Sequence, residues 1–215
     1  MPALSVALNG DHLLTVATDG FDVLDVGVSG DCLGPERATL RVSGGSYPEG
    51  RESQYLIWED ERTLMPGDTL SVTFLAAGAT SQRGKTIDEL HPDKMPTEHK
   101  PFAPIEEVIQ ELKLQPRAFD ALAFEFIGPD GGRVQAQTTT EEHGYCFTVL
   151  WNSHRPERAR VSAHTYTLDS LVAKENGKYH ADAKLSFGQR VVFKVLAPNN
   201  TVERDARKSG ARPSP

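Results

Sequence analysis

The sequence lacks the short motifs that mark most nucleotide-binding and hydrolytic enzymes. It contains no G-x-x-x-x-G-K-[ST] phosphate loop, no G-x-G-x-x-G between a strand and a helix, and no G-x-S-x-G turn around a nucleophilic serine. Its histidines and cysteines form no complete zinc-ligand spacing. The sequence therefore assigns no catalytic residue, no metal and no cofactor.

Long apolar runs and basic leaders are also missing. No stretch approaches the ~20 apolar residues that cross a bilayer, and the residues after Met1 show no signal-peptide pattern. The chain has only two cysteines, Cys32 and Cys146, which we expect to be free thiols in a reducing compartment. These absences predict a cytoplasmic protein without a membrane partner.

Basic residues are scarce where a nucleic-acid partner would need them. The chain holds 23 Lys and Arg against 30 Asp and Glu, for a net charge of −7. Residues 1–100 contain twice as many acidic as basic residues. An acidic body repels a phosphate backbone and favours a basic protein as partner. Positive charge is offered only by the run Arg155, Arg158 and Arg160 and by the tail over 199–215, which we expect to be disordered.

The sequence is rich in short alternating segments separated by turn residues, a pattern typical of antiparallel β-structure. Asn9-Gly10 predicts a tight hairpin because its turn needs positive φ angles. The apolar phase changes at Leu24-Asp25, which predicts a bulge there. The acidic residues 59–61 are interpreted as a connection between strands. Strands are expected near 4–8, 12–17, 21–28, 37–43, 54–58, 69–75, 121–127, 133–140, 145–151, 160–168 and 190–196.

Two helical segments stand out from this β pattern. Thr86 and Glu89 have capping-box spacing, which predicts one helical turn over 86–90. The segment 104–114 predicts a longer helix, because Pro104 suits a first turn and the apolar residues fall on one stripe. Four prolines between residues 92 and 104 indicate a linker before this helix.

An internal repeat connects the two halves of the chain. The segment 64–76 aligns without a gap on 185–197, and 35–42 resembles 156–161, with the same offset of 121 residues. We therefore expect a mainly β protein of two related antiparallel sandwich-like domains, residues 1–90 and 118–198, joined by a Pro-rich linker and helix over 91–117. The alternative is one larger sandwich whose edge hairpins look alike.

Aromatic residues beside charges are the best candidates for a binding site, because such residues are common at interaction hot spots. One group contains Tyr55, Trp58, Glu59, Asp60 and Glu61, and the other contains Trp151 and Arg155. The alternative is that the two tryptophans fill the core, one in each half.

The pattern Tyr55-Leu56-x-Trp58, followed by Leu64-x-Pro66-Gly67-Asp68-x-Leu70-x-Val72, comes after the hairpin on Asn9-Gly10. It resembles small bacterial proteins of unassigned function, some of them encoded near toxin–immunity or secretion loci. The resemblance implies a bacterial, immunity-type or accessory protein and assigns no catalytic residue.

We accordingly expect a non-catalytic protein-binding protein whose acidic N-terminal half engages a basic partner. Two alternatives remain open. One is a hydrolase with an active site between the domains that uses His154 or His164, and the other is a structural subunit of a phage or secretion particle.

Overall fold

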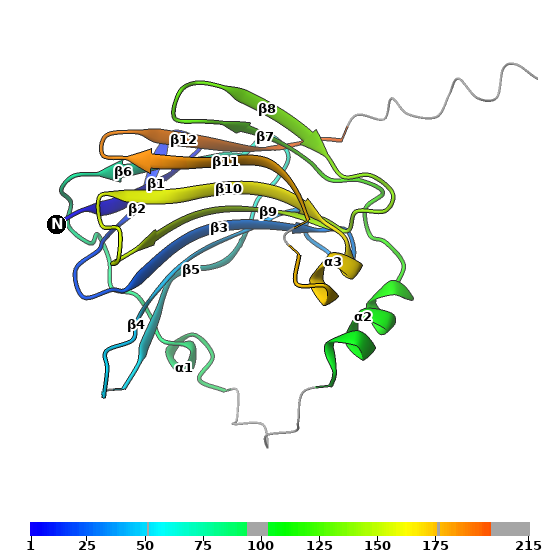
Figure 1. Ribbon diagram of the computed structural model, residues 1–215, viewed down its shortest axis with the longest axis horizontal. Coiled ribbons are helices and arrows are strands. Elements are labelled where there is room, and N and C mark those ends of the chain that lie inside the picture. The colour runs from blue at the N-terminus through cyan, green and yellow to red at the C-terminus, as the bar shows by residue number, and fades with distance from the viewer. Residues whose placement is uncertain (51, 94–102, 176, 199–215) are drawn as a thin grey trace, which may run out of the picture.

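The computed structural model describes residues 1–50, 52–93, 103–175 and 177–198. It is a sandwich of two antiparallel six-stranded sheets (Figure 1). Sheet A has the order β2-β1-β6-β12-β7-β8, and sheet B has the order β11-β10-β9-β3-β4-β5. The strands are β1 (Ala3–Leu8), β2 (Asp11–Ala17), β3 (Val23–Asp31), β4 (Thr39–Ser46), β5 (Gln54–Thr63), β6 (Thr69–Leu75), β7 (Ala123–Ile127), β8 (Arg133–Gln137), β9 (Gly144–Asn152), β10 (Arg158–Tyr166), β11 (Lys178–Ser186) and β12 (Arg190–Leu196). The helices are α1 (Ile87–Leu90), α2 (Ile105–Lys113) and α3 (Leu168–Val172).

The two related halves that the repeat predicts are present as two six-stranded units. Strands β1 to β6 form the first unit and β7 to β12 form the second. The offset of 121 residues carries both bounds of β3 onto those of β9, and both bounds of β6 onto those of β12. The expected fold class, mainly β and antiparallel with a sandwich-like architecture and few helices, is confirmed.

The two units interleave about an approximate two-fold axis. Each unit contributes three adjacent strands to sheet A and three to sheet B, and the units meet where β6 pairs with β12 and β3 with β9. The β3–β9 pairing is symmetric: Val23 lies opposite Asn152, Gly144 opposite Asp31, and Gly27 opposite Thr148 at its centre. Both units therefore bury their apolar residues in one shared core.

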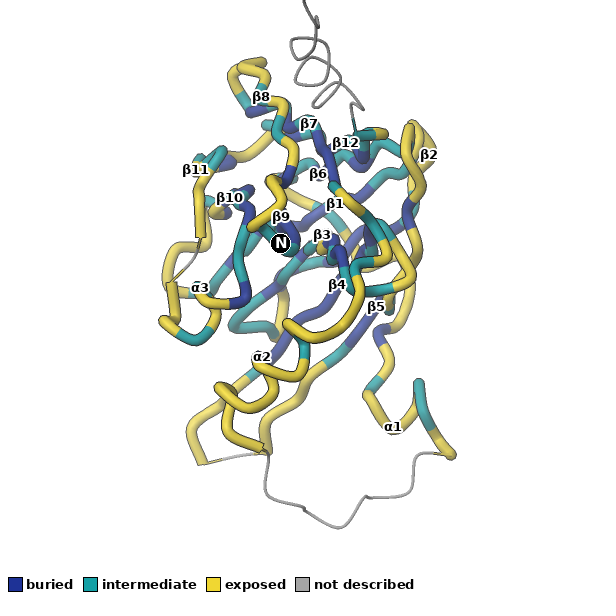
Figure 2. Tube along the Cα trace, turned by 90° about the vertical axis from the view of Figure 1, so that its right-hand side faces the viewer, coloured by how far each residue is buried: buried dark blue, intermediate teal, exposed yellow. Residues whose placement is uncertain are grey.

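This core lies between the sheets and follows from the period of two along each strand. In β3 the buried residues Leu24, Val26 and Val28 alternate with residues that face away from sheet A. Aromatic rings fill the centre, where Phe193 stacks on both Phe124 and Phe147. Figure 2 shows the buried positions recurring along the facing strands of the two sheets.

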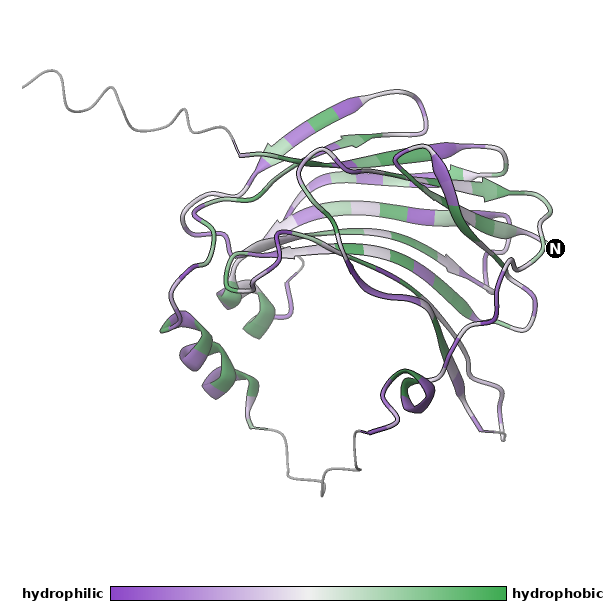
Figure 3. Cartoon of the chain, turned by 180° about the vertical axis from the view of Figure 1, so that it is seen from behind, coloured by the Kyte–Doolittle hydropathy of each residue, from purple (hydrophilic) through white to green (hydrophobic). Residues whose placement is uncertain are grey.

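Local signals placed several elements correctly. The β1–β2 hairpin turns at Asn9 and Gly10, both with positive φ. Helix α1 has the capping box between Thr86 and Glu89. Helix α2 begins after Pro104 and is amphipathic, with one hydrophobic and one hydrophilic side in Figure 3. No helix of the described residues is long and apolar enough to span a membrane.

Three local expectations were wrong or incomplete. The register of β3 with both neighbours is continuous, so there is no bulge at Leu24-Asp25. The acidic residues 59–61 belong to β5 rather than to a connection, and the irregularity lies there instead, because β5 shifts register twice against β4 and Glu61 has a φ of 53°. Strand β11 and helix α3 were not expected. The expected disordered tail lies outside the described residues.

The segment between β6 and α1 closes one end of the sandwich. The hydroxyl groups of Thr80 and Ser81 accept hydrogen bonds from the backbone of β2, the edge strand of sheet A. Further along, the backbone of Lys85 exchanges two hydrogen bonds with Ile57 on β5, the edge strand of sheet B. These contacts cover strand edges that would otherwise be open to pairing, and they hold α1 against β5.

Candidate functional site

The outer face of sheet B, which points away from sheet A, carries most of the unusual polar chemistry of the molecule. Helices α2 and α3 lie on this side of the sheet (Figure 2). Alternation along the strands places on it Asp25, Gly27 and Ser29 of β3, Arg41 and Ser43 of β4, Cys146, Thr148 and Leu150 of β9, and Ser162 and His164 of β10.

Glycine and hydroxyl-bearing residues occupy the middle of this face, and we call them the floor of the face. The register aligns Ser162, Thr148 and Gly27 in one row across three adjacent strands. Ser43 lies beside Asp25 in the next row. These small side chains project less than their larger neighbours. Their hydroxyl groups can form hydrogen bonds with a ligand that lies across the strands.

Three buried polar atoms on this side of sheet B have no hydrogen-bond partner among the described residues. They are Nε of Arg41, Oδ1 of Asn152 and Nδ1 of His164. Only one other buried side-chain atom of the described chain shares this property, the hydroxyl of Tyr145 in the core. A buried polar group without a partner costs about 1–3 kcal/mol, and these three atoms lie in separate rows of the face.

Asp25 lies near the centre of the face and is half-buried. Burial raises the pKa of its carboxyl group to about 6, although the nearby Arg41 guanidinium lowers it. No hydrogen bond and no ion pair within 4 Å joins this carboxylate to any other described residue. It is a desolvated acid on which the Arg41 guanidinium acts without forming an ion pair within 4 Å.

Arg41 is directed instead toward the rim formed by β5. Its Nε lies 3.9 Å from Oδ1 of Asp60, and its guanidinium carbon lies 5.9 Å from the centre of the Tyr55 ring. On the other side of Asp60, Nε2 of His91 approaches Oδ2 at 3.6 Å. Asp60 thus joins strand β5 to the end of α1, and the Arg41 guanidinium acts on both Asp60 and Asp25.

Tyrosines stand at two diagonally opposite corners of the face. At the corner of β4 and β5, Tyr55 is 37% exposed, and the ring of Tyr47 lies over Gly45. At the corner of β10 and β11, the ring of Tyr179 lies 5.4 Å from that of His164, and Tyr166 lies over Gly144. The chain has five tyrosines, and only Tyr145 points into the core. Tyrosine supplies contact area at a small entropic cost, so it is common in binding surfaces.

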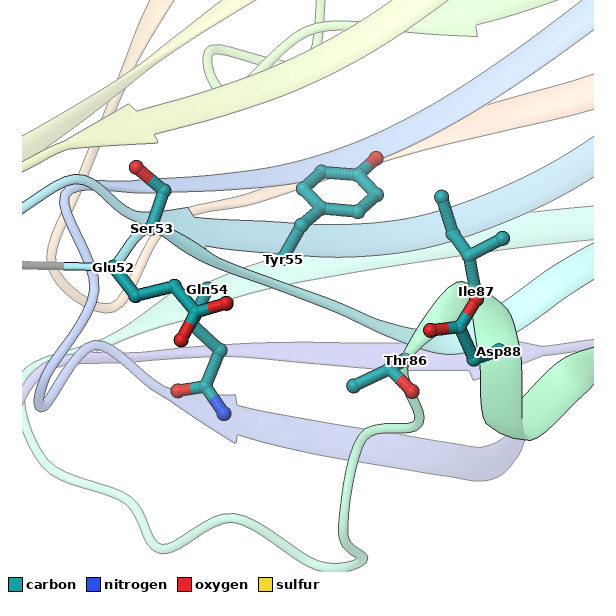
Figure 4. A pocket seen from close by; sticks show the side chains of 7 residues that line it. All are labelled: Glu52, Ser53, Gln54, Tyr55, Thr86, Ile87 and Asp88. Atoms are coloured by element: carbon teal, nitrogen blue, oxygen red, sulfur yellow. The ribbon is translucent and has the colours of Figure 1, made fainter. Parts of the chain in front are cut away.

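An open depression of about 660 Å³ adjoins the first corner. It lies between the start of β5 and the start of α1, and is lined by Glu52, Ser53, Gln54, Tyr55, Thr86, Ile87 and Asp88. Figure 4 shows Tyr55 and Ile87 projecting to the same side from these two elements. Ile87 is 53% exposed, so the depression offers apolar as well as polar contacts.

No family model, curated protein or solved structure matches this chain. The resemblance to small bacterial proteins near toxin–immunity loci stays a prediction, and function has to be argued from the geometry.

The structure separates the residues that the sequence proposed for binding. Trp58 and Trp151 lie in the core, with 8% and 3% of their surfaces exposed. Each indole donates a hydrogen bond to a backbone carbonyl, Trp58 to Gln82 at 3.1 Å and Trp151 to Pro156 at 3.2 Å. Both tryptophans therefore have the features of the core residues in the alternative interpretation.

The three acidic residues of β5 do not act together. Glu59 forms an ion pair with Arg62 at 2.8 Å, Asp60 faces Arg41, and Glu61 is exposed. Arg155 is exposed in the turn between β9 and β10, at the Trp151 end of β9. Of the proposed residues, Tyr55 and Asp60 thus lie beside the outer face of sheet B. The sequence did not indicate Asp25, because the expected bulge hid its position on this face.

One buried group contains the residue types of a hydrolase but not the necessary arrangement. The Thr165 hydroxyl donates a hydrogen bond to Glu142 and contacts Nε2 of His180 at 3.0 Å. In a catalytic triad the histidine lies between the acid and an accessible nucleophile. Here the hydroxyl lies in the middle and is fully buried. The group links β10, β11 and the segment before β9, and no cluster of three or more metal-binding side chains occurs in the described parts of the chain.

Proposed function

We propose that this chain is a non-catalytic binding protein that receives an extended segment of a basic partner protein on the outer face of sheet B. The observation that carries this proposal is the row of small residues Ser162, Thr148 and Gly27 across the middle of that face, with partly exposed tyrosines at two opposite corners. A polypeptide that crosses the face offers backbone donors and acceptors at regular spacing, and such groups can form hydrogen bonds with the hydroxyl groups of Thr148 and Ser162.

Charge and aromatic content agree with a protein partner. The net charge of −7 favours a basic chain over nucleic acid. Tyrosines at opposite corners of the face provide contacts at both ends of an extended segment. An immunity-type or accessory role, which the resemblance implies, is one form that such binding would take. Bacterial origin and cytoplasmic location stay predictions.

A substitution that fills the floor of the face tests this proposal. Gly27 lies at the approximate two-fold axis, and a Cβ atom there would meet only the flexible Asp25 carboxylate within 3.4 Å. Its φ is not in the left-handed region, so Gly27→Phe should fold and project a ring across the floor. The matched control is Ser71→Phe, at the middle of β6 in sheet A, where the serine is half-buried and points away from the core.

Proteins captured from a lysate of the source organism are quantified for the native chain and both variants. The proposal predicts a protein that the native chain and Ser71→Phe retain and Gly27→Phe loses. Equal capture by all three chains, with circular dichroism showing them folded, would place the binding surface elsewhere.

A further inference from the structure

Asp25 lies on the outer face of sheet B, in the row next to that of Gly27, Thr148 and Ser162. Its neighbours along β3 include Gly27, and its neighbour on β4 is Ser43, which is buried. On the other side its cross-strand neighbour is Leu150. The two cross-strand neighbours of this carboxylate are therefore one small and one apolar side chain.

The charged groups around Asp25 compensate its charge only in part. The groups that face it are Arg41 on β4 and the Cys146 thiol on β9. Arg41 is the only cation that affects its titration, and that guanidinium forms its ion pair with Asp60. On β10, Arg160 is held by two hydrogen bonds to Asp182 on β11. Arg41 and Arg160 thus each have a carboxylate within 4 Å, while Asp25 forms no ion pair within 4 Å with any described residue.

A buried carboxylate in this state is costly at neutral pH, since burial disfavours its charged form. A cation placed against it would recover that cost as a charge-assisted hydrogen bond. Nothing in the core or in the strand pairing requires an acid at this position, because the side chain points away from both.

From this geometry we infer that Asp25 is the specificity-determining residue of the face and binds a lysine or arginine side chain of the extended segment. This inference rests on the proposed function and names the chemistry that the partner must supply. The segment lies across the hydroxyl floor, its cationic group enters between Ser43 and Leu150, and the tyrosine corners contact the residues on either side.

The test uses octalysine as the probe, at a physiological salt concentration that screens long-range attraction. Fully extended, the peptide spans about 26 Å, which is comparable to the width of six strands at about 4.8 Å each. The decisive variant is Asp25→Asn. Its control is Asp11→Asn, which makes the same change of net charge at an exposed position of sheet A. Gly27→Phe reports on the face itself.

We expect octalysine to bind the full-length native chain, to bind Asp11→Asn within about twofold of it, and to bind Asp25→Asn at least tenfold more weakly, the factor expected when one charge-assisted hydrogen bond is lost. In the native chain, binding should also weaken from pH 7.5 to pH 5, as Asp25 takes up a proton. This pH dependence should be much smaller in Asp25→Asn, where only other groups titrate.

Equal losses in the two asparagine variants would show general attraction to an acidic protein and would overturn the inference. Loss of octalysine binding in Gly27→Phe, without loss in Asp25→Asn, would also overturn it while the proposed function stands. Unchanged binding in both Asp25→Asn and Gly27→Phe would contradict the inference and the proposed function together.

Discussion

Asp25 links the stability of the protein to its proposed binding role. Its folded-state pKa of about 6 lies above the ordinary value of 3.8, so the folded protein holds this proton more tightly than the unfolded chain does. Its contribution to stability is therefore present below about pH 4 and is lost as the pH rises to about 6. At neutral pH the native chain carries the full cost of the ionised group.

Replacing Asp25 by asparagine should remove this cost. The neutral amide imitates the protonated acid, so Asp25→Asn should increase the free energy of unfolding at pH 7.5 by about 2 kcal/mol and should change it little at pH 4. Urea unfolding at the two pH values measures this difference. Asp11→Asn is the control, and a destabilised Asp25→Asn at pH 7.5 would show that the carboxylate supports the fold instead.

In contrast to Asp25, the two tryptophans are expected to stabilise the fold and to contribute nothing to binding. Trp58 is packed edge-on against Phe21 at 5.3 Å and holds the Gln82 carbonyl. Trp58→Phe removes that hydrogen bond and part of the buried ring, so it should lower the free energy of unfolding by about 1–3 kcal/mol. Octalysine affinity, measured on the folded variant, should stay the same. A large loss of octalysine affinity would show that Trp58 belongs to the binding site.

Among the elements, α1 depends most on a single local interaction. It has only four residues, none of them buried, and its capping box joins the backbone and side chains of Thr86 and Glu89. Thr86→Ala should therefore release α1 from β5 and accelerate hydrogen exchange over residues 86–91, at a cost of about 1 kcal/mol. Thr86→Ser keeps the cap and should exchange like the native chain. Equal exchange in both variants would show that the Lys85–Ile57 contact suffices to hold the helix.

Elements with strong local signals could be predicted from the sequence, and those defined by distant partners could not. Asn9-Gly10 and Thr86 act on neighbouring residues, so their patterns were sufficient. Strand β11 alternates apolar and polar residues, but two of its four apolar residues are alanines and Leu185 is its one buried residue. This weak pattern was not recognised, and the strand forms because β10 supplies a pairing edge. The position of Asp25 was missed for a similar reason: sheet pairing fixes the phase of β3, whereas its sequence includes apolar residues of both phases.

At the scale of the whole molecule, the repeat predicted two related units but not their interleaving. A repeat shows which strands correspond, while the choice of partner strand depends on contacts far apart in sequence. The candidate site likewise depends on pairing between strands that are far apart in sequence. Asp25 and Arg41 come from the first unit, and Thr148 and His164 from the second. Local patterns could therefore identify Tyr55 and Asp60 but not the face they border.

Shared sheets also predict that the two units unfold together. Each unit contains one tryptophan, Trp58 in the first and Trp151 in the second. Trp58→Phe and Trp151→Phe leave a single fluorescent reporter in opposite units. Within each variant, fluorescence and far-ultraviolet circular dichroism should give the same urea midpoint. Two separate transitions in one variant would indicate units that fold independently.

The account depends most on the outer face of sheet B being the binding surface. The most direct measurement is the dissociation constant of the captured partner for folded Gly27→Phe and Ser71→Phe. The account predicts at least a hundredfold weaker binding for Gly27→Phe, because its ring would occupy the floor of the face, and an unchanged constant for Ser71→Phe. An unchanged constant for Gly27→Phe, or equal losses in both variants, would contradict it.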